Sequence, residues 1–205
     1  MTQRVWKFIA AATTEMATPV YNSLIQAGDR FEQAIAKLQS LLSVRNLRTV
    51  LTAPVSVGAS SIVDLTIITL PVAANRAQVG DVYDIELRGL WTKPNSAGTT
   101  IQFWVKVDTV KVVTLTYTPG AAITNLPFVM RARVTVRSIG AAGVLAGAGD
   151  MTLATSATAV AYVIAGGATD TQNTTAAFNI TAGIVFSNSN ASNNVTANVG
   201  YIRQG

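Results

Sequence analysis

From residue 47 onward, apolar and polar residues alternate in the manner of half-buried β-strands. Over 82–91, for example, apolar side chains occupy one face of the predicted strand, and Asp84, Glu86 and Arg88 occupy the other. Turn-forming residues recur about every 8 to 12 positions between such runs. The same pattern predicts further strands over 47–53, 62–70, 101–107, 110–118, 128–138, 177–186 and 195–202.

Three stretches depart from simple alternation. Residues 62–70 are apolar at nearly every position, which is typical of a strand buried on both faces. Residues 151–164 fit either one strand followed by a long loop or two short strands. Residues 140–149 are rich in glycine and alanine, and we expect a flexible or close-packed loop there.

The pattern therefore predicts about eight to ten strands with almost no helix between them. Without alternation of strands and helices, the sheets should be antiparallel. Eight strands with long connections favour a jelly roll over an immunoglobulin sandwich. The predicted fold class is mainly β: an antiparallel jelly-roll β-sandwich over 47–205, preceded by an N-terminal α-helix.

The predicted helix covers residues 18–46. Thr18 is a suitable N-cap, and Pro19 suits the first helical position. An apolar stripe then follows at heptad spacing, formed by Tyr21, Leu24, Phe31, Ile35, Leu38 and Leu42. Such a helix can lie on its own sandwich or form a short bundle between subunits. Because few polar residues interrupt the stripe, we favour the bundle between subunits.

Residues 1–17 precede this helix and form a predicted arm. Trp6, Phe8 and Ile9 lie close together in it. The arm can fold back on its own domain or dock on another protein. Burying each of these side chains contributes on the order of 1.5 to 3 kcal/mol. We therefore expect these three residues to anchor the chain to another protein.

The charge composition limits the classes of partner. Only 12% of residues are charged, whereas about 25% is typical of soluble domains. The 15 Lys and Arg against 10 Asp and Glu give a net charge of +5, but the basic residues are scattered singly. We therefore expect no strong nucleic-acid binding. The chain has no apolar stretch of 18 residues, so we expect no membrane span, and the short apolar segment near the start does not suit a signal peptide.

The chain contains no histidine and no cysteine, which removes most enzymatic chemistry. Catalytic triads, imidazole acid–base steps and zinc sites built on these residues are excluded. Asp84 and Glu86 share one strand face, but Arg88 lies beside them. On another strand, Arg131, Arg133 and Arg137 form a row of like charge. We expect ion pairs between these rows and no catalysis. We also expect no metal and no cofactor, because no calcium-loop motif is present.

Three aromatic residues are candidates for stacking against sugars: Trp91, Trp104 and Tyr117. Trp104 alternates with the inward Phe103, so we expect it to be exposed or to lie at an interface. Packing beneath a neighbouring subunit or the helix is the alternative to sugar binding.

A strand ending in proline at 68–71 is followed by Val79-Gly80-Asp81, which starts the strand at 82–91. In this arrangement the β region resembles jelly-roll structural proteins of phages. The runs 128–140 and 187–196 also resemble this class. The resemblance covers about residues 60–205. It implies a subunit of tumour-necrosis-factor or C1q-like shape, of the kind found in capsid decoration proteins, head fibres and tail fibres.

The resemblance implies a non-enzymatic virion protein that works as a homotrimer. Its expected partners are a major capsid protein or a tail or portal protein, and its expected location is the virion after synthesis in the host cytoplasm. In this arrangement the arm attaches to the particle and the β domain points outward. Two alternatives stay open: a fibre tip that binds a host receptor or surface glycan, and a jelly-roll capsid shell subunit.

Overall fold

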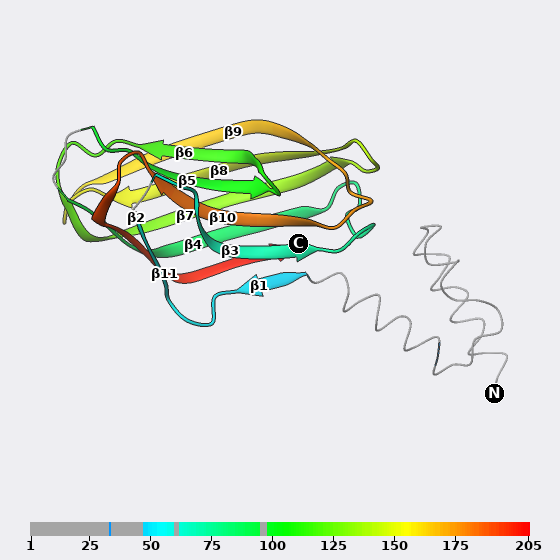
Figure 1. Cartoon of the computed structure of the whole chain (residues 1–205), viewed down its shortest axis with the longest axis horizontal. Helices are drawn as coiled ribbons and strands as arrows, with labels where there is room; N and C mark the ends of the chain where they lie inside the picture. The colour runs from blue at the N-terminus through cyan, green and yellow to red at the C-terminus, as the bar shows by residue number, and fades with distance from the viewer. Residues whose placement is uncertain (1–32, 34–46, 60–61, 95–97) are drawn as a thin grey trace. The chain divides into compact units, whose positions relative to one another are not determined.

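The computed structural model describes residue 33 and residues 47–59, 62–94 and 98–205 (Figure 1). The chain divides into two compact units, Met1–Asn46 and Leu47–Gly205. The predicted arm at 1–17 and, apart from the helical Gln33, the predicted helix at 18–46 lie outside the described residues.

The second unit is built from antiparallel strands, which confirms a mainly β architecture. Eleven strands occur in the described part of the chain, against the eight to ten expected. They are β1 (Arg48–Val50), β2 (Val55–Ala59), β3 (Leu65–Val72), β4 (Val82–Lys93), β5 (Ile101–Val107), β6 (Val110–Tyr117), β7 (Ile123–Ser138), β8 (Gly143–Ala154), β9 (Val160–Gln172), β10 (Phe178–Phe186) and β11 (Asn190–Gln204).

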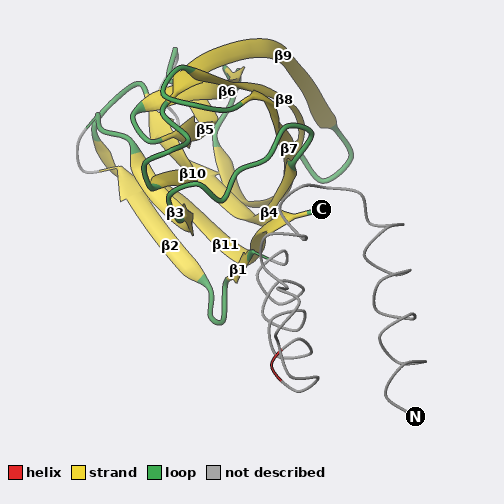
Figure 2. Cartoon of the chain, turned by 90° about the vertical axis from the view of Figure 1, so that its right-hand side faces the viewer, coloured by secondary structure: helices red, strands yellow, loops and turns green. Residues whose placement is uncertain are grey.

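The strands form two sheets that face each other (Figures 1 and 2). The large sheet has the order β1-β11-β4-β7-β8-β9, and β2 also pairs with β11. The small sheet has the order β3-β10-β5-β6. Four of the pairs are nested along the chain: β5 with β6, β4 with β7, β3 with β10, and β2 with β11. The β8–β9 hairpin is inserted within this nest and extends the large sheet beyond β7.

The core lies between the two sheets and follows the alternation in the sequence. Along β4, the buried residues Tyr83, Ile85 and Leu87 alternate with partly exposed charged neighbours. Phe103 of the small sheet and Phe128 of the large sheet meet across the interior, with ring centroids 4.9 Å apart. Burial of each such large apolar side chain contributes about 1.5 to 3 kcal/mol, so these contacts hold the sheets together.

The strand predicted at 62–70 begins later than its composition indicated. β3 starts at Leu65, and Ile62 and Val63 are exposed in a bend before it. Asp64 ends this bend by pairing with Lys106 and Lys111, each at 2.7 Å. Along β3, Ile68, Leu70 and Val72 are buried on one face, whereas Thr69 and Pro71 on the other face are partly or fully exposed, so the strand is not buried on both faces as expected.

The glycine- and alanine-rich segment at 140–149 is mostly strand β8, so the predicted loop is wrong. A methyl group at Gly147 would lie 2.5 Å from the carbonyl oxygen of Val112, and one at Gly149 would lie 2.6 Å from that of Arg131. The glycines therefore permit close packing of β8 against its neighbours. The ambiguous stretch at 151–164 divides between β8 and β9, which are joined by a turn at 155–159.

Candidate functional site on the outer face of the large sheet

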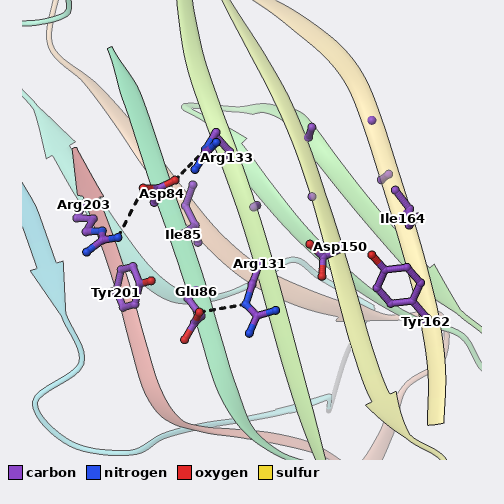
Figure 3. A pocket seen from close by; sticks show the side chains of 15 residues that line it. Asp84, Ile85, Glu86, Arg131, Arg133, Asp150, Tyr162, Ile164, Tyr201 and Arg203 are labelled. Carbon is purple, nitrogen blue, oxygen red and sulfur yellow. Dashed lines mark hydrogen bonds and ion pairs between the residues drawn. The ribbon is translucent and has the colours of Figure 1, made fainter. Parts of the chain in front are cut away.

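The large sheet carries a groove on the face turned away from the core. Five adjacent strands, β11, β4, β7, β8 and β9, contribute side chains to it (Figure 3). Its volume is about 600 Å³. We call it the outer-face groove, and its lining residues are Asp84, Ile85, Glu86, Arg131, Ala132, Arg133, Ala148, Gly149, Asp150, Tyr162, Ile164, Ala165, Gly166, Tyr201 and Arg203.

Strand register arranges the polar lining in two rows that cross the sheet. One row runs from β11 to β9 through Tyr201, Glu86, Arg131, Asp150 and Ile164. Direct cross-strand neighbours in antiparallel sheets have Cβ atoms only about 5 Å apart, so charges of opposite sign in such a row interact.

The second row begins with Arg203 on β11 and continues through Asp84 on β4 and Arg133 on β7. Arg133 donates through Nε to Asp84 Oδ1 at 2.9 Å. The Nη2 of Arg203 lies 3.8 Å from the other oxygen of Asp84. One carboxylate is thus held between two guanidinium groups from opposite neighbouring strands.

Glu86 in the first row is also held by two arginines. Arg88 donates through Nε to Oε1 of Glu86 at 2.5 Å, and Arg131 donates through Nε to Oε2 at 3.3 Å. The hydrogen bond from Arg88 lowers the pKa of the Glu86 carboxyl, whereas burial raises it. The hydrogen bond from Arg131 lowers it again, so the pKa of Glu86 lies below its ordinary value of 4.5. Glu86 is therefore a charged, paired group.

Arg137 belongs to the predicted arginine row, but the structure places no described carboxylate beside it. None of the described carboxylates lies within ion-pair distance of it. β4 begins at Val82, so it places no strand carboxylate opposite Arg137, and the nearby Asp81 accepts instead from the backbone N–H of Gln78 at 2.7 Å. A register shift between Val136 and Ser138 also interrupts β7 there.

Four polar groove residues were absent from the sequence-based candidates: Tyr201 and Arg203 on β11, Asp150 on β8 and Tyr162 on β9. Asp150 lies directly across from Arg131 but makes no ion pair or hydrogen bond with any described residue. Tyr162 stands on β9, and its ring points into the groove (Figure 3). Placing these side chains in one groove required the order of the strands in the sheet. For Tyr162 the sequence also left open whether its segment is a strand or a loop.

The edge strand β9 carries an apolar stripe beside the groove. Val160, Tyr162 and Ile164 lie on its outward face and are 69%, 61% and 70% exposed. On its opposite face, Val163 and Ala165 pack against the core. β9 is also the last strand of the large sheet. An exposed apolar edge of this kind is typical of a surface that another molecule covers.

The aromatic residues that the sequence indicated for sugar stacking are not exposed. Trp91 is buried, donates to the carbonyl oxygen of Ala154 at 3.1 Å and packs edge-on against Tyr117. Trp104 is buried too, so the expected exposure of its ring is wrong. The ammonium groups of Lys106 and Lys111 lie 4.8 and 5.9 Å from its ring centroid and cover it from within the same chain.

The predicted helix seam (Tyr21, Leu24, Phe31, Ile35, Leu38 and Leu42) and the predicted anchor (Trp6, Phe8 and Ile9) lie outside the described residues. Within the described ranges, no cluster of three or more His, Cys, Asp or Glu residues could hold a metal ion. Likewise, none of the helical structure described there is long and apolar enough to cross a membrane.

The groove presents a polar surface whose charges balance. Its lining contains three arginines and three carboxylates, so their formal charges cancel. Two of the carboxylates are engaged by arginines, while Asp150 and the exposed guanidinium groups face solvent. Such a surface offers hydrogen-bond donors and acceptors over several strands.

No protein family and no curated protein matches the sequence. Among solved structures, the chain is similar to VP2 of infectious bursal disease virus, in a subviral particle, with 11% identity and a TM-score of 0.32 over 78% of this chain. The match spans about a third of VP2, 32% of that chain. The chain is also similar to the CBM2 module of the evolved Dit of Lactobacillus casei BL23 phage J-1, with 8% identity and a TM-score of 0.30. That match covers 66% of this chain and 67% of that chain.

Proposed function

We propose that this chain is a non-enzymatic structural protein of a virus particle, which decorates the capsid or forms a fibre as a homotrimer. The observation that carries the proposal is the apolar stripe of Val160, Tyr162 and Ile164 on the edge strand β9. A subunit that acts alone would leave this stripe and the free strand edge in water, where both promote association. A subunit of an assembly can cover the free edge and Val160, which does not line the groove, while the groove side of Tyr162 and Ile164 stays accessible.

The strand connectivity supports a jelly roll, the fold that the sequence resemblance implies. Four nested pairs, β5–β6, β4–β7, β3–β10 and β2–β11, are what results when one long antiparallel ribbon folds over itself into two sheets. We interpret β8 and β9 as a hairpin inserted between β7 and β10, the third and second strands counted from the end of this ribbon. Viral capsid proteins are among the users of this fold.

The chemistry of the groove supports the non-enzymatic part of the proposal. The chain has no histidine or cysteine, so acid–base work would fall to carboxylates. Asp84 and Glu86, the pair that shares a strand face, are each held by two arginines. The arginines stabilise Glu86 in its charged form, which suits a structural ion pair better than a general acid.

Oligomeric state tests the trimer. Light scattering of the full-length chain at micromolar concentration should give three times the chain mass, because the apolar stripes at 21–42 and on β9 both favour association. A monomer at that concentration would contradict the proposal.

Location tests the particle role. Mass spectrometry of purified particles should detect the chain, and cryo-electron microscopy should place its β domain outward. A variant with Trp6, Phe8 and Ile9 replaced by alanine should keep its oligomeric state and lose binding to particles stripped of this protein. Equal binding by the variant would move the anchor elsewhere in the chain.

A further inference from the structure

We propose that the outer-face groove binds a neutral saccharide chain, laid across the strands between Tyr201 and Tyr162. This site goes beyond the structural role in the particle and does not depend on it, since the subunit contact proposed there covers the free edge of β9 and Val160 and leaves the groove side of Tyr162 open. Of the aromatic residues expected from the sequence to bind sugars, Trp91 and Trp104 are buried and Tyr117 is half-buried, whereas these two tyrosines face the groove (Figure 3).

The two tyrosines mark the ends of the site. Tyr201 lies on β11 and Tyr162 on β9, four strand spacings apart, which corresponds to about 19 Å across the sheet. The guanidinium carbon of Arg203 lies 5.3 Å from the ring centroid of Tyr201 and restricts the motion of that ring. Aromatic rings present an apolar face with a polar tip, which complements the C–H faces and hydroxyls of a sugar.

The floor between the tyrosines carries alternating hydrogen-bond donors and acceptors. Arg131 and Arg133 each use Nε for an ion pair, and their terminal amino groups make no further bond to the described residues. Asp150 sits beside Arg131 as an acceptor without a partner. A hydroxyl group both donates and accepts, so it can bridge Asp150 and Arg131 in a way that a purely anionic group cannot.

The charge balance favours a neutral sugar over a nucleic acid or an acidic polymer. The lining arginines Arg131, Arg133 and Arg203 are matched in number by the three lining carboxylates. Grooves that bind single-stranded nucleic acid combine stacking aromatics with excess positive charge. Here the carboxylates would oppose a phosphate chain, while a neutral chain meets no net repulsion.

The groove also has the dimensions and openness for a chain ligand. It spans five strands and holds about 600 Å³, within the range of about 300 to 1,000 Å³ that is usual for ligand sites. Ile164 and the glycine at 166 lie at its β9 end. A methyl group at Gly166 would meet nothing within 4 Å, so this end is open for a chain to continue.

The test is binding of the full-length chain to short neutral oligosaccharides of glucose, galactose, mannose and N-acetylglucosamine, by array and by calorimetry. We expect at least one series to bind. Tyr162→Ala should weaken that binding at least about tenfold, and Tyr162→Phe should stay within about twofold, since the ring is retained. Asp150→Asn should weaken binding by about tenfold through loss of a charged acceptor.

Two controls keep the result interpretable. Val110→Ala, on the small sheet, should bind as the original chain does, and circular dichroism should show that every variant keeps its fold. Failure of all four sugar series to bind would overturn the proposal, and so would equal binding by Tyr162→Ala. Tyrosine-dependent binding of an oligothymidylate with a steep dependence on salt would replace it with a nucleic-acid site.

Discussion

Arg133 on β7 donates through Nε to Oδ1 of Asp84 on β4 at 2.9 Å, and the two residues are direct cross-strand neighbours. Their pairing links the two central strands of the large sheet, but Arg133 is largely exposed and solvent screens the pair. A double-mutant cycle with Arg133→Ala and Asp84→Ala should therefore give a coupling energy of about 0.2 to 1 kcal/mol in urea unfolding. A coupling above about 2 kcal/mol would show that the pair is desolvated.

The stability contribution of Glu86 should depend on pH. Its pKa in the folded chain is depressed below 4.5, first by the hydrogen bond from Arg88. The contribution is therefore present above pH 4.5 and is lost as pH falls through the folded-state pKa. Glu86→Gln should be less stable than the original chain at pH 7, and the difference in unfolding free energy should shrink towards pH 3. A difference that stays constant over this range would contradict the ion-pair account.

Removal of a core ring should be far more costly than removal of a surface side chain. Phe103 is fully buried and meets Phe128 across the sheets, so Phe103→Ala leaves a cavity and should lower the unfolding free energy by about 3 to 5 kcal/mol. Val110→Ala, at a position 42% exposed on β6, should change it by less than about 0.5 kcal/mol. Similar losses of unfolding free energy for the two variants would mean that Phe103 does not pack in the core between the sheets.

A methyl group at Gly89 should disturb the pairing of β4 with β11. It would lie 1.9 Å from the carbonyl oxygen of Thr196, which is closer than any real contact. Gly89→Ala should therefore destabilise the chain by about 1 to 3 kcal/mol in chemical unfolding. Gly120→Ala is the matched control, because a methyl there meets nothing within 4 Å. Equal stability of the two variants would show that the strands separate readily at Gly89.

A charge on the apolar stripe of β9 should weaken association of the chain. Val160→Lys places an ammonium group on a surface that we propose is covered in the assembly, and burying it would be costly. We expect at least a tenfold higher dissociation constant in sedimentation experiments. Val110→Lys introduces the same charge on the small sheet and should leave association unchanged. If both variants associate like the original chain, the stripe is not an interface.

The local pattern was sufficient to place most strands and both charged rows. Alternation of period two determines which face a side chain takes, so the shared face of Asp84 and Glu86 followed from their spacing alone. The turn at Asp108 was also predictable, because aspartate tolerates the positive φ of +49° found there. These features depend on neighbours only a few residues away.

The position of each strand in the sheets depended on the tertiary structure. Strand β8 has a glycine-rich sequence that is typical of a loop, and it forms a strand because its glycines let neighbouring backbones approach closely. Trp104 alternates as an outward residue, yet Lys106, Lys111 and the absence of a side chain at Gly183 allow it to be buried on the outer face of the small sheet.

The sequence by itself thus determined the mainly β fold class, the faces of most strands and most residues of the ion-pair rows, although it omitted Arg203 and included Arg137, which meets no acid among the described residues. Only the tertiary structure decided that Tyr201, Glu86, Arg131, Asp150 and Ile164 form one row across five strands. The physical reason is the distance along the chain over which each effect acts. Alternation acts through each residue's own backbone. The order of strands instead follows from burying apolar faces against segments that can lie more than a hundred positions away, and no local pattern specifies that choice.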